Sequence, residues 1–395
     1  METNWKNMII RFLSAQTISL FGSSLVQYAI VWYITLTTSS GVMMTVSTLC
    51  GFVPQILISL FAGVWIDRYD RKKMIMLSDT AIALSTLLLA IVFLSGFKNI
   101  GLLFAVLVIR SAGAGIQTPA VNAVIPQIVP KERLMKVNGI NSTLTSLMMF
   151  MSPAVSGAVL SVASFETTLF IDVATALIGV GITSTVRIKR LKPGNAQSSL
   201  MEIKGGFAYL KKNPFIKRLL VFQLVILFLI SPSAFLTPLM VSRTFGAEVW
   251  RLTASEMTYS LGMILGGLLI SAWGGFKKRL HTTLFAGALY GLLMIGIGGS
   301  TFFILYLACN TLIGITSPCY NAPVTVTIQE NVPQQLHGRV FSLMQVATSC
   351  ALPLGMAAFG PLADVVSVQV ILIVTGITVA CISFAAWKFG FLHKE

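Results

Sequence analysis

The chain has 395 residues, of which 55% are hydrophobic and 10% charged, and its mean hydropathy of +0.84 excludes an ordinary soluble globular protein. The formal net charge is +15, but the basic residues lie mostly in short gaps between apolar runs. This distribution is typical of membrane topology and argues against nucleic acid as a partner. The five cysteines lie in or beside apolar runs without paired spacing, so we expect neither a disulfide framework nor a metal site.

Twelve apolar runs are each long enough to cross a bilayer, which takes about 20 residues in a helix. In chain order they lie near 11–36, 41–66, 74–96, 100–121, 136–162, 167–187, 217–242, 254–275, 281–299, 302–322, 339–363 and 368–390. The first run follows Met1–Lys6 and is too long for a cleaved signal segment, so we expect it to be retained. The sequence therefore predicts an all-α integral membrane protein with twelve transmembrane helices.

The positions of the basic residues predict which helix ends face the cytoplasm. If both termini are cytoplasmic, Lys98, Arg243 and Arg251 fall outside and Arg110 lies within a span. The remaining 24 of the 28 Lys and Arg residues then fall on the inner side. Because loops rich in Lys and Arg stay inside, we expect a multi-pass protein of the plasma membrane with cytoplasmic termini.

A polar interval at 188–216 divides the chain into two sets of six spans. We expect a six-helix bundle at 1–187, a cytoplasmic linker at 188–216 and a second six-helix bundle at 217–395. Within the linker, residues 199–212 predict an amphipathic helix that lies on the anionic lipids of the inner leaflet. Its apolar face carries Leu200, Ile203, Phe207 and Leu210, and its basic residues are Lys204, Lys211 and Lys212.

The segment Gly63–Lys73, between the second and third runs, packs six charges into its last seven residues. Such a cluster cannot stay in hydrocarbon, so we expect a tight turn at the membrane surface. Its four Lys and Arg residues mark that surface as cytoplasmic. The segment is either a generic positive-inside loop or a conformational latch.

The pattern Gly63-x-x-x-Asp67-Arg68-x-x-Arg71-Lys72-Lys73 resembles the signature loop of the major facilitator superfamily, although Asp70 stands where that signature often has glycine. The resemblance implies the major facilitator fold of two six-helix bundles. It also implies that Asp67 meets the N-terminus of the eleventh helix, whose partial positive charge attracts a carboxylate. The latch residues would be Gly63, Asp67, Arg68, Arg71 and Arg339.

Further matches resemble a drug-exporting branch of that family. Gly139, Pro153 and Gly157 fit the spacing of the antiporter motif in the fifth span, and the stretches 122–126 and 338–342 are similar to the macrolide-efflux branch. The resemblance implies a monomeric, non-enzymatic exporter of amphipathic drugs that exchanges them for protons and needs no cofactor. A lipid or siderophore exporter on the same fold is the alternative. The chain has no Gly-x-x-x-x-Gly-Lys-Ser/Thr loop, which an ATP-driven pump would need.

Ionisable residues deep in a span are costly and need a partner or a wet cavity. Arg110 lies about 15 Å from the outer end of the fourth span at 1.5 Å per residue, near the middle of the bilayer. It is either a contact for substrate or protons, or half of a structural ion pair. For proton coupling we favour Asp172 with Arg110, because Asp172 lies inside the sixth span. The other candidates are Asp79, Glu330 and Asp364.

Polar residues at helical spacing predict the lining of a central cavity. In the first span Gln16, Ser19, Ser23 and Gln27 recur every three or four residues and so share one face. The predicted cavity residues are Gln16, Ser23, Gln27, Arg110, Asn141, Asn310 and Tyr259. Sparse polar groups among aromatic residues suit a large amphipathic molecule better than a sugar or a phosphate. The alternative is that small polar residues serve helix packing.

Overall fold

The computed structural model describes residues 2–188, 209–211, 213–333 and 336–389. Within these ranges every regular element is a helix. The helices are α1 (Glu2–Thr38), α2 (Gly41–Arg68), α3 (Arg71–Leu94), α4 (Ile100–Ile128), η1 (Lys131–Arg133), α5 (Leu134–Val162), α6 (Phe165–Thr185), α8 (Pro214–Phe235), α9 (Thr237–Thr244), α10 (Val249–Trp273), α11 (Arg279–Gly298), α12 (Phe303–Asn331), α13 (His337–Leu362) and α14 (Val368–Lys388). The predicted amphipathic helix at 199–212 falls almost wholly outside the described residues.

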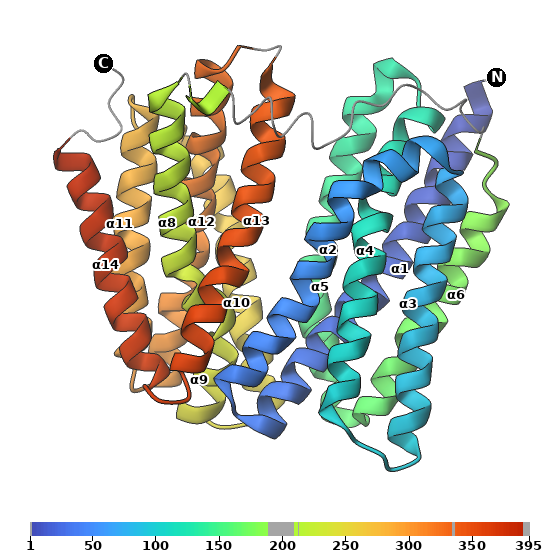
Figure 1. Cartoon of the computed structure of the whole chain (residues 1–395), viewed down its shortest axis with the longest axis horizontal. Coiled ribbons are helices and arrows are strands. Elements are labelled where there is room, and N and C mark those ends of the chain that lie inside the picture. The colour runs from blue at the N-terminus through green and yellow to red at the C-terminus, as the bar shows by residue number, and fades with distance from the viewer. Residues whose placement is uncertain (1, 189–208, 212, 334–335, 390–395) are drawn as a thin grey trace. The chain divides into compact units, whose positions relative to one another are not determined.

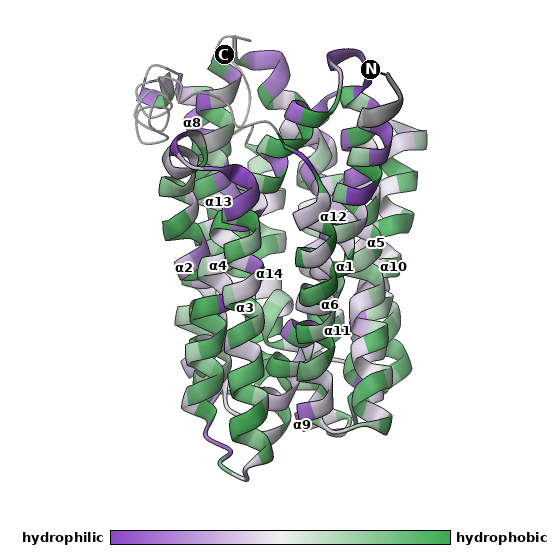
Figure 2. Cartoon of the chain, turned by 90° about the vertical axis from the view of Figure 1, so that its right-hand side faces the viewer, coloured by the Kyte–Doolittle hydropathy of each residue, from purple (hydrophilic) through white to green (hydrophobic). Residues whose placement is uncertain are grey.

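The predicted all-α membrane fold is confirmed. Eleven helical segments among the described residues are long and apolar enough to cross a membrane by length and composition. The remaining long helix, α10, corresponds to the eighth predicted span and carries Arg251 and Glu256 near its start. Figure 2 shows apolar residues along most of each helix and hydrophilic residues toward the helix ends.

Side-chain caps fix where several helices begin. Asp70, Asn99, Ser164 and Asn213 each accept a hydrogen bond from a backbone N–H in the first turn of the helix that follows. Such caps satisfy N–H groups that have no partner within the helix. The helix starts therefore follow from local sequence.

One predicted boundary is wrong. Gly63–Lys73 is not one turn, because α2 continues to Arg68 and α3 starts at Arg71, which leaves only Tyr69 and Asp70 between them. The seventh predicted span lies within one segment of spanning length, Pro214–Thr244, but its helix is interrupted at Leu236, between α8 and α9. Proline explains the break, because Pro238 in the first turn of α9 has no N–H to continue the helical ladder.

The chain divides into two compact units (Figure 1). The first comprises residues 1–34 and 49–199, and the second comprises residues 35–48 and 200–395. In the first unit, buried apolar side chains of α1, α2, α3 and α4 form a core around Phe12, Ile75 and Val124. In the second, α8, α11, α12 and α14 form a core around Leu219, Leu284 and Val324.

Residues 35–48, at the turn between α1 and α2, group with the second unit through Asp364. Its carboxylate accepts hydrogen bonds from the N–H groups of Gly41 at 2.6 Å and Val42 at 2.9 Å, and from the Ser40 hydroxyl at 2.8 Å. Arg243 pairs with the same carboxylate at 3.1 Å. Burial alone raises the pKa of Asp364, but these donors together hold it below its ordinary value.

Candidate functional site

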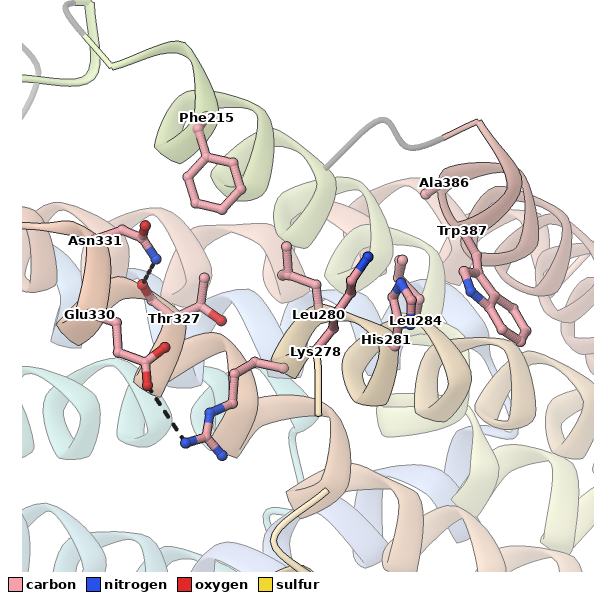
Figure 3. Close-up of a pocket in the computed structure, with 11 residues that line it drawn as sticks. Phe215, Lys278, Leu280, His281, Leu284, Thr327, Glu330, Asn331, Ala386 and Trp387 are labelled. Carbon is pink, nitrogen blue, oxygen red and sulfur yellow. Dashed lines mark hydrogen bonds and ion pairs between the residues drawn. The ribbon is translucent and has the colours of Figure 1, made fainter. Parts of the chain in front are cut away.

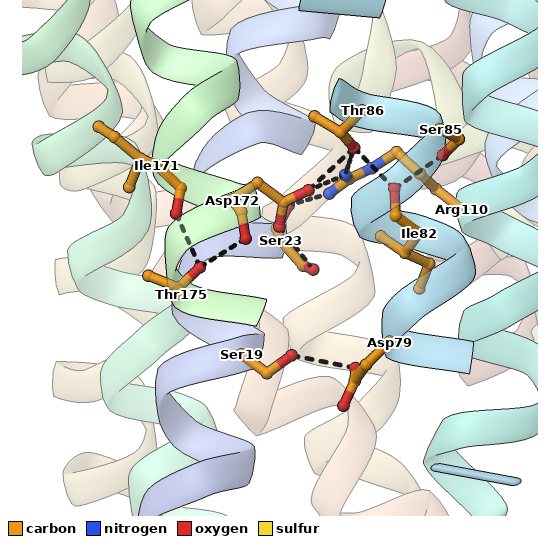
Figure 4. Close-up of polar contacts among 10 residues, drawn as sticks. All are labelled: Ser19, Ser23, Asp79, Ile82, Ser85, Thr86, Arg110, Ile171, Asp172 and Thr175. Atoms are coloured by element: carbon orange, nitrogen blue, oxygen red, sulfur yellow. Dashed lines mark hydrogen bonds and ion pairs between the residues drawn. The ribbon is translucent and has the colours of Figure 1, made fainter. Parts of the chain in front are cut away.

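A buried ion pair lies inside the first unit, between Arg110 on α4 and Asp172 on α6 (Figure 4). The Nη1 atom of Arg110 contacts Oδ2 of Asp172, and the two side chains are 5% and 0% exposed. Removing two opposite charges from water costs several kcal/mol per ion unless each finds a partner in good geometry. The structure thus brings together the two residues that the sequence nominated for proton coupling.

Hydroxyl groups from α1 and α3 complete the pair. Thr86 on α3 accepts from Arg110 Nη1 at 2.7 Å and lies 3.0 Å from Asp172 Oδ2. Ser23 on α1 donates to Asp172 Oδ1 at 3.1 Å, and its backbone carbonyl accepts from Arg110 Nη2 at 2.8 Å. Four helices are therefore tied to a single polar centre, as Figure 4 shows for the side chains.

A second buried carboxylate, Asp79 on α3, lies in the same unit and is 3% exposed. Its Oδ1 accepts hydrogen bonds from Ser19 at 3.0 Å and from Gln117 at 2.5 Å. Its Oδ2 is buried and has no hydrogen-bond partner among the described residues. Unlike Asp172, this carboxylate has no basic side chain paired with it in the part of the chain described.

The polar face predicted for the first span points into the first unit over most of its length. Gln16 donates to Thr183 on α6 at 3.4 Å, Ser19 contacts Asp79, and Ser23 contacts Asp172. Gln27, one step further, is half-buried, as is Asn141 on α5. The first three residues of this face therefore satisfy buried groups within their own bundle.

The predicted cavity residues of the second unit meet at one small pocket. Asn310 on α12 donates to the carbonyl of Ser255 at 2.7 Å and to the Thr258 hydroxyl at 3.2 Å. With Tyr259 on α10 it lines a pocket of about 110 Å³ that also contains Glu256. Sequence reasoning did not single out Glu256. The signal that could have found it is a carboxylate eight residues into a helix of spanning length.

The predicted latch residues have different surroundings. Arg71 donates to the carbonyl of Ile66 at 3.2 Å and to that of Ala123 at 2.8 Å, so it ties the end of α2 to α4. Arg68 and Arg339 are exposed. Gly63 and Asp67 lie within α2, and their side chains are outside the described part of the structure.

The residues of the predicted antiporter motif all lie on α5. Pro153 and Gly157 are buried, while Gly139 has open space where a side chain would project. Ser156, beside Gly157, donates to the carbonyl of Leu25 on α1 at 3.1 Å. The buried part of the motif thus packs α5 against α1.

The two remaining carboxylate candidates lie at helix ends. Glu330 borders a pocket of about 290 Å³ between α8, α11, α12 and α14 (Figure 3). It is 52% exposed and pairs with Arg279 at 3.6 Å. Asp364 lies in the turn after α13, where Arg243 and the start of α2 hold it. Among the described residues, no three His, Cys, Asp or Glu side chains gather as a metal site would require.

Comparison with known proteins covers nearly the whole chain. Residues 12–355 match the family model described as Major Facilitator Superfamily. The chain is 31% identical to Macrolide efflux protein A of Streptococcus pyogenes over 398 residues, covering 99% of this chain and 98% of that protein. It is 21% identical to the Staphyloferrin A transporter of Staphylococcus aureus, covering 97% and 96%. A solved bacterial homologue of the human lysosomal transporter Spinster shares the fold with a TM-score of 0.72 and 14% identity, covering 99% and 97%.

Proposed function

The chain belongs to the major facilitator superfamily, and we propose that it exports amphipathic, macrolide-like drugs across the plasma membrane in exchange for protons. The observation that carries this proposal is the likeness to a macrolide efflux protein along practically the full length of both chains. Transport would proceed by alternating access of two six-helix bundles, at 1–187 and 217–395. The protein would act as a monomer with cytoplasmic termini, without catalysis and without a cofactor, and its linker would lie on membrane lipids.

In this proposal the buried ion pair couples export to protons. A proton that reaches Asp172 neutralises its carboxylate and removes the electrostatic hold on Arg110. The Ser23 hydroxyl remains beside Asp172 and the Thr86 hydroxyl beside both groups, so the pair can re-form when the proton leaves. Each proton that moves inward across 100 mV supplies about 2.3 kcal/mol, before any contribution from a pH gradient.

The substrate would contact a mostly apolar cavity with few polar groups. Such a lining suits a large amphipathic molecule, because apolar surface supplies affinity and sparse polar groups fix orientation. The residues proposed for this contact are Gln16, Ser23, Gln27, Arg110, Asn141, Asn310 and Tyr259. Pro153 and Gly157 would hold α5 close to α1 while the cavity changes shape. Gly139 would leave open space at its own position on α5.

The end of α2 and the start of α3 would act as a latch, through Gly63, Asp67, Arg68 and Arg71 together with Arg339. We expect Asp67→Asn to slow export of substrate at least tenfold without reducing the amount of folded protein. Asp70→Asn is the matched control, because asparagine caps a helix as well as aspartate does and Asp70 caps α3. If Asp67→Asn exports substrate at the wild-type rate, the latch hypothesis is wrong and the segment is only a positive-inside loop.

The test of the proposed function combines two assays. Expression in a host that lacks its own exporters should raise resistance to macrolides or hydrophobic cations, and those drugs should stimulate proton flux in proteoliposomes. The second candidate is a lipid or siderophore exporter, which the likeness to a staphyloferrin transporter favours. Unchanged susceptibility across the whole drug panel would favour that candidate and contradict drug export.

A further inference from the structure

Glu256 on α10 takes no part in the ion pair, the latch or the antiporter motif described above. It lies seven residues after the start of α10, about 10 Å along the helix at 1.5 Å per residue. Its side chain is half-buried, and it makes no hydrogen bond or ion pair with any described residue. An ionised carboxylate at this depth without a partner is costly, which makes it a candidate for function.

The pocket around Glu256 offers no counter-ion. It is lined by Ser233, Ala234, Thr237, Ser255, Glu256, Tyr259, Tyr290, Asn310 and Ile313, among which there is no Lys, Arg or His. The nearest basic residue on the same helix, Arg251, pairs with Glu248 at 2.9 Å and donates to the carbonyl of Phe245. Arg251 is therefore already engaged, so no described residue of this pocket supplies a positive charge to Glu256, and a cationic ligand could supply it.

The other groups in the pocket suit an ammonium ion. Two aromatic side chains, Tyr259 and Tyr290, line the pocket, and aromatic rings attract a cation that lies over their faces. The hydroxyl of Tyr290 is within 3.0 Å of that of Ser233, and the Asn310 amide already donates to Ser255 and Thr258. The polar group of the pocket that is left without a partner among the described residues is therefore the Glu256 carboxylate. A carboxylate is an acceptor, which attracts a cation and repels an anion.

We propose that this pocket binds the amino group of a cationic amphipathic substrate, with Glu256 as its counter-ion. This inference rests on the proposed drug export and names the chemistry of one part of the substrate. A volume of about 110 Å³ has room for a small substituted ammonium group, so the apolar body of the substrate lies elsewhere. The break between α8 and α9 at Leu236 borders the pocket, because Ser233, Ala234 and Thr237 flank it.

A carboxylate that holds an amine can hold a proton instead, so substrate and proton compete for Glu256. The other titratable groups that face it are phenols: Tyr259 on α10, Tyr290 on α11 and Tyr306 on α12. The residues of α8 and α9 that line the pocket carry no titratable group. Competition below neutral pH therefore reports on Glu256 alone among the groups of this pocket.

The test measures binding to the purified full-length protein in lipid nanodiscs. The probes are radiolabelled octyltrimethylammonium, whose charge does not depend on pH, and its uncharged isostere with a tert-butyl group in place of trimethylammonium. We expect Glu256→Gln to weaken binding of the cation at least tenfold and to change binding of the isostere less than twofold. Glu248→Gln is the matched control, because Glu248 is the N-cap residue of α10 and pairs with Arg251 outside the pocket; it should leave both affinities unchanged.

Two outcomes would overturn the proposal: unchanged affinity of Glu256→Gln for the cation, or wild-type binding of the cation that does not weaken from pH 8 to pH 5. If Glu256→Gln loses both probes equally, Glu256→Asp decides, because retained charge should restore preference for the cation. A Glu256→Asp variant without that preference would also overturn the proposal. If the protein exports no drug but binds the cation in a way that depends on Glu256, the proposed function is contradicted and the cation site is supported. If the protein exports drugs but cation binding does not depend on Glu256, the proposed function is supported and the cation site is contradicted.

Discussion

The ion pair between Arg110 and Asp172 allows a sharp test of whether it braces the bundle, drives transport, or does both. Both side chains are almost fully buried, so removal of one partner leaves an uncompensated charge, at a cost of about 3–5 kcal/mol. We expect Arg110→Met and Asp172→Asn each to lose stability in that range. Asparagine keeps the side-chain shape of aspartate but leaves the guanidinium without a counter-ion.

The double variant Arg110→Met/Asp172→Asn should recover most of this loss. Removal of both charges ends the electrostatic penalty. The carbonyl of Ser23 lies in the interior of α1 and keeps the hydrogen bond of the helix, and the side-chain contact of Ser23 to residue 172 can persist. The lost hydrogen bond from the charged Arg110 to this carbonyl costs about 1.5–3 kcal/mol. The Thr86 hydroxyl keeps a partner, because it also lies 3.0 Å from the carbonyl of Ile82. The sum of the stability losses of the two single variants should therefore exceed the loss of the double variant by at least about 3 kcal/mol.

The assays are equilibrium unfolding with a denaturing detergent and drug-driven proton flux in proteoliposomes. A stable double variant without proton flux would support coupling through the pair. Losses that simply add would refute the argument from mutual compensation. A stable double variant with wild-type flux would show that the pair is a brace only.

Two further predictions concern stability of the second unit. Gly262→Ala should cost about 1–3 kcal/mol in unfolding experiments, because its Cβ would lie 2.1 Å from the Thr311 carbonyl oxygen of α12, whereas Gly267→Ala, with open space, should cost nothing. Asp364→Asn should lower the melting temperature at pH 7. Since the native pKa of Asp364 is lowered, its contribution is present above the unfolded value of about 3.9 and fades as pH falls through the native value. An equal deficit at pH 7 and pH 3 would contradict this.

Hydrophobic length predicted the helices well because the bilayer permits few alternatives. Each predicted span corresponds to a helix or, for the seventh, a pair of helices, and polar caps such as Asn99 and Ser164 fixed several starts. The break at Leu236 was missed because Pro232 and Pro238 are each compatible with a kinked continuous helix. Which outcome occurs depends on packing around the break, and hydropathy does not report packing.

The sequence indicated that Arg110 and Asp172 are individually important, but not that they form a pair. The depth of Arg110 indicated that it needed a carboxylate or water, and Asp172 was the favoured acid. No periodicity links two residues 62 positions apart on different helices, so their pairing depends on how α4 and α6 pack. The roles of Thr86 and Ser23 follow from that packing as well. Glu256 was not predicted, because the helical spacing of polar residues selects amides and hydroxyl groups that share one face, and Glu256 belongs to none of the predicted sets.

The three carboxylates at depth differ in how well their charge is compensated, and this difference bears on how antiport could work. Asp172 has a basic partner, Asp79 has two hydrogen-bond donors and one oxygen without a partner, and Glu256 has neither. A paired carboxylate can accept a proton only if the pair breaks, which links protonation to movement of helices. An unpaired carboxylate can exchange an amine for a proton with no such movement.

Antiport requires that the protein does not carry substrate and proton across the membrane in the same direction at once. The unpaired Glu256 and the paired Asp172 would meet this requirement in different ways. If Glu256 binds both ligands in turn, competition at one carboxylate suffices, and the pair in the first unit can remain closed throughout. If Asp172 carries the proton, opening of the pair must weaken substrate binding, either through Arg110 and Ser23 themselves or through movement of the helices that carry them. The double variant separates these cases, because cation-dependent proton flux that survives without Arg110 and Asp172 but is lost in Glu256→Gln would assign exchange to Glu256. Loss of flux in both variants would require the two centres to act in series.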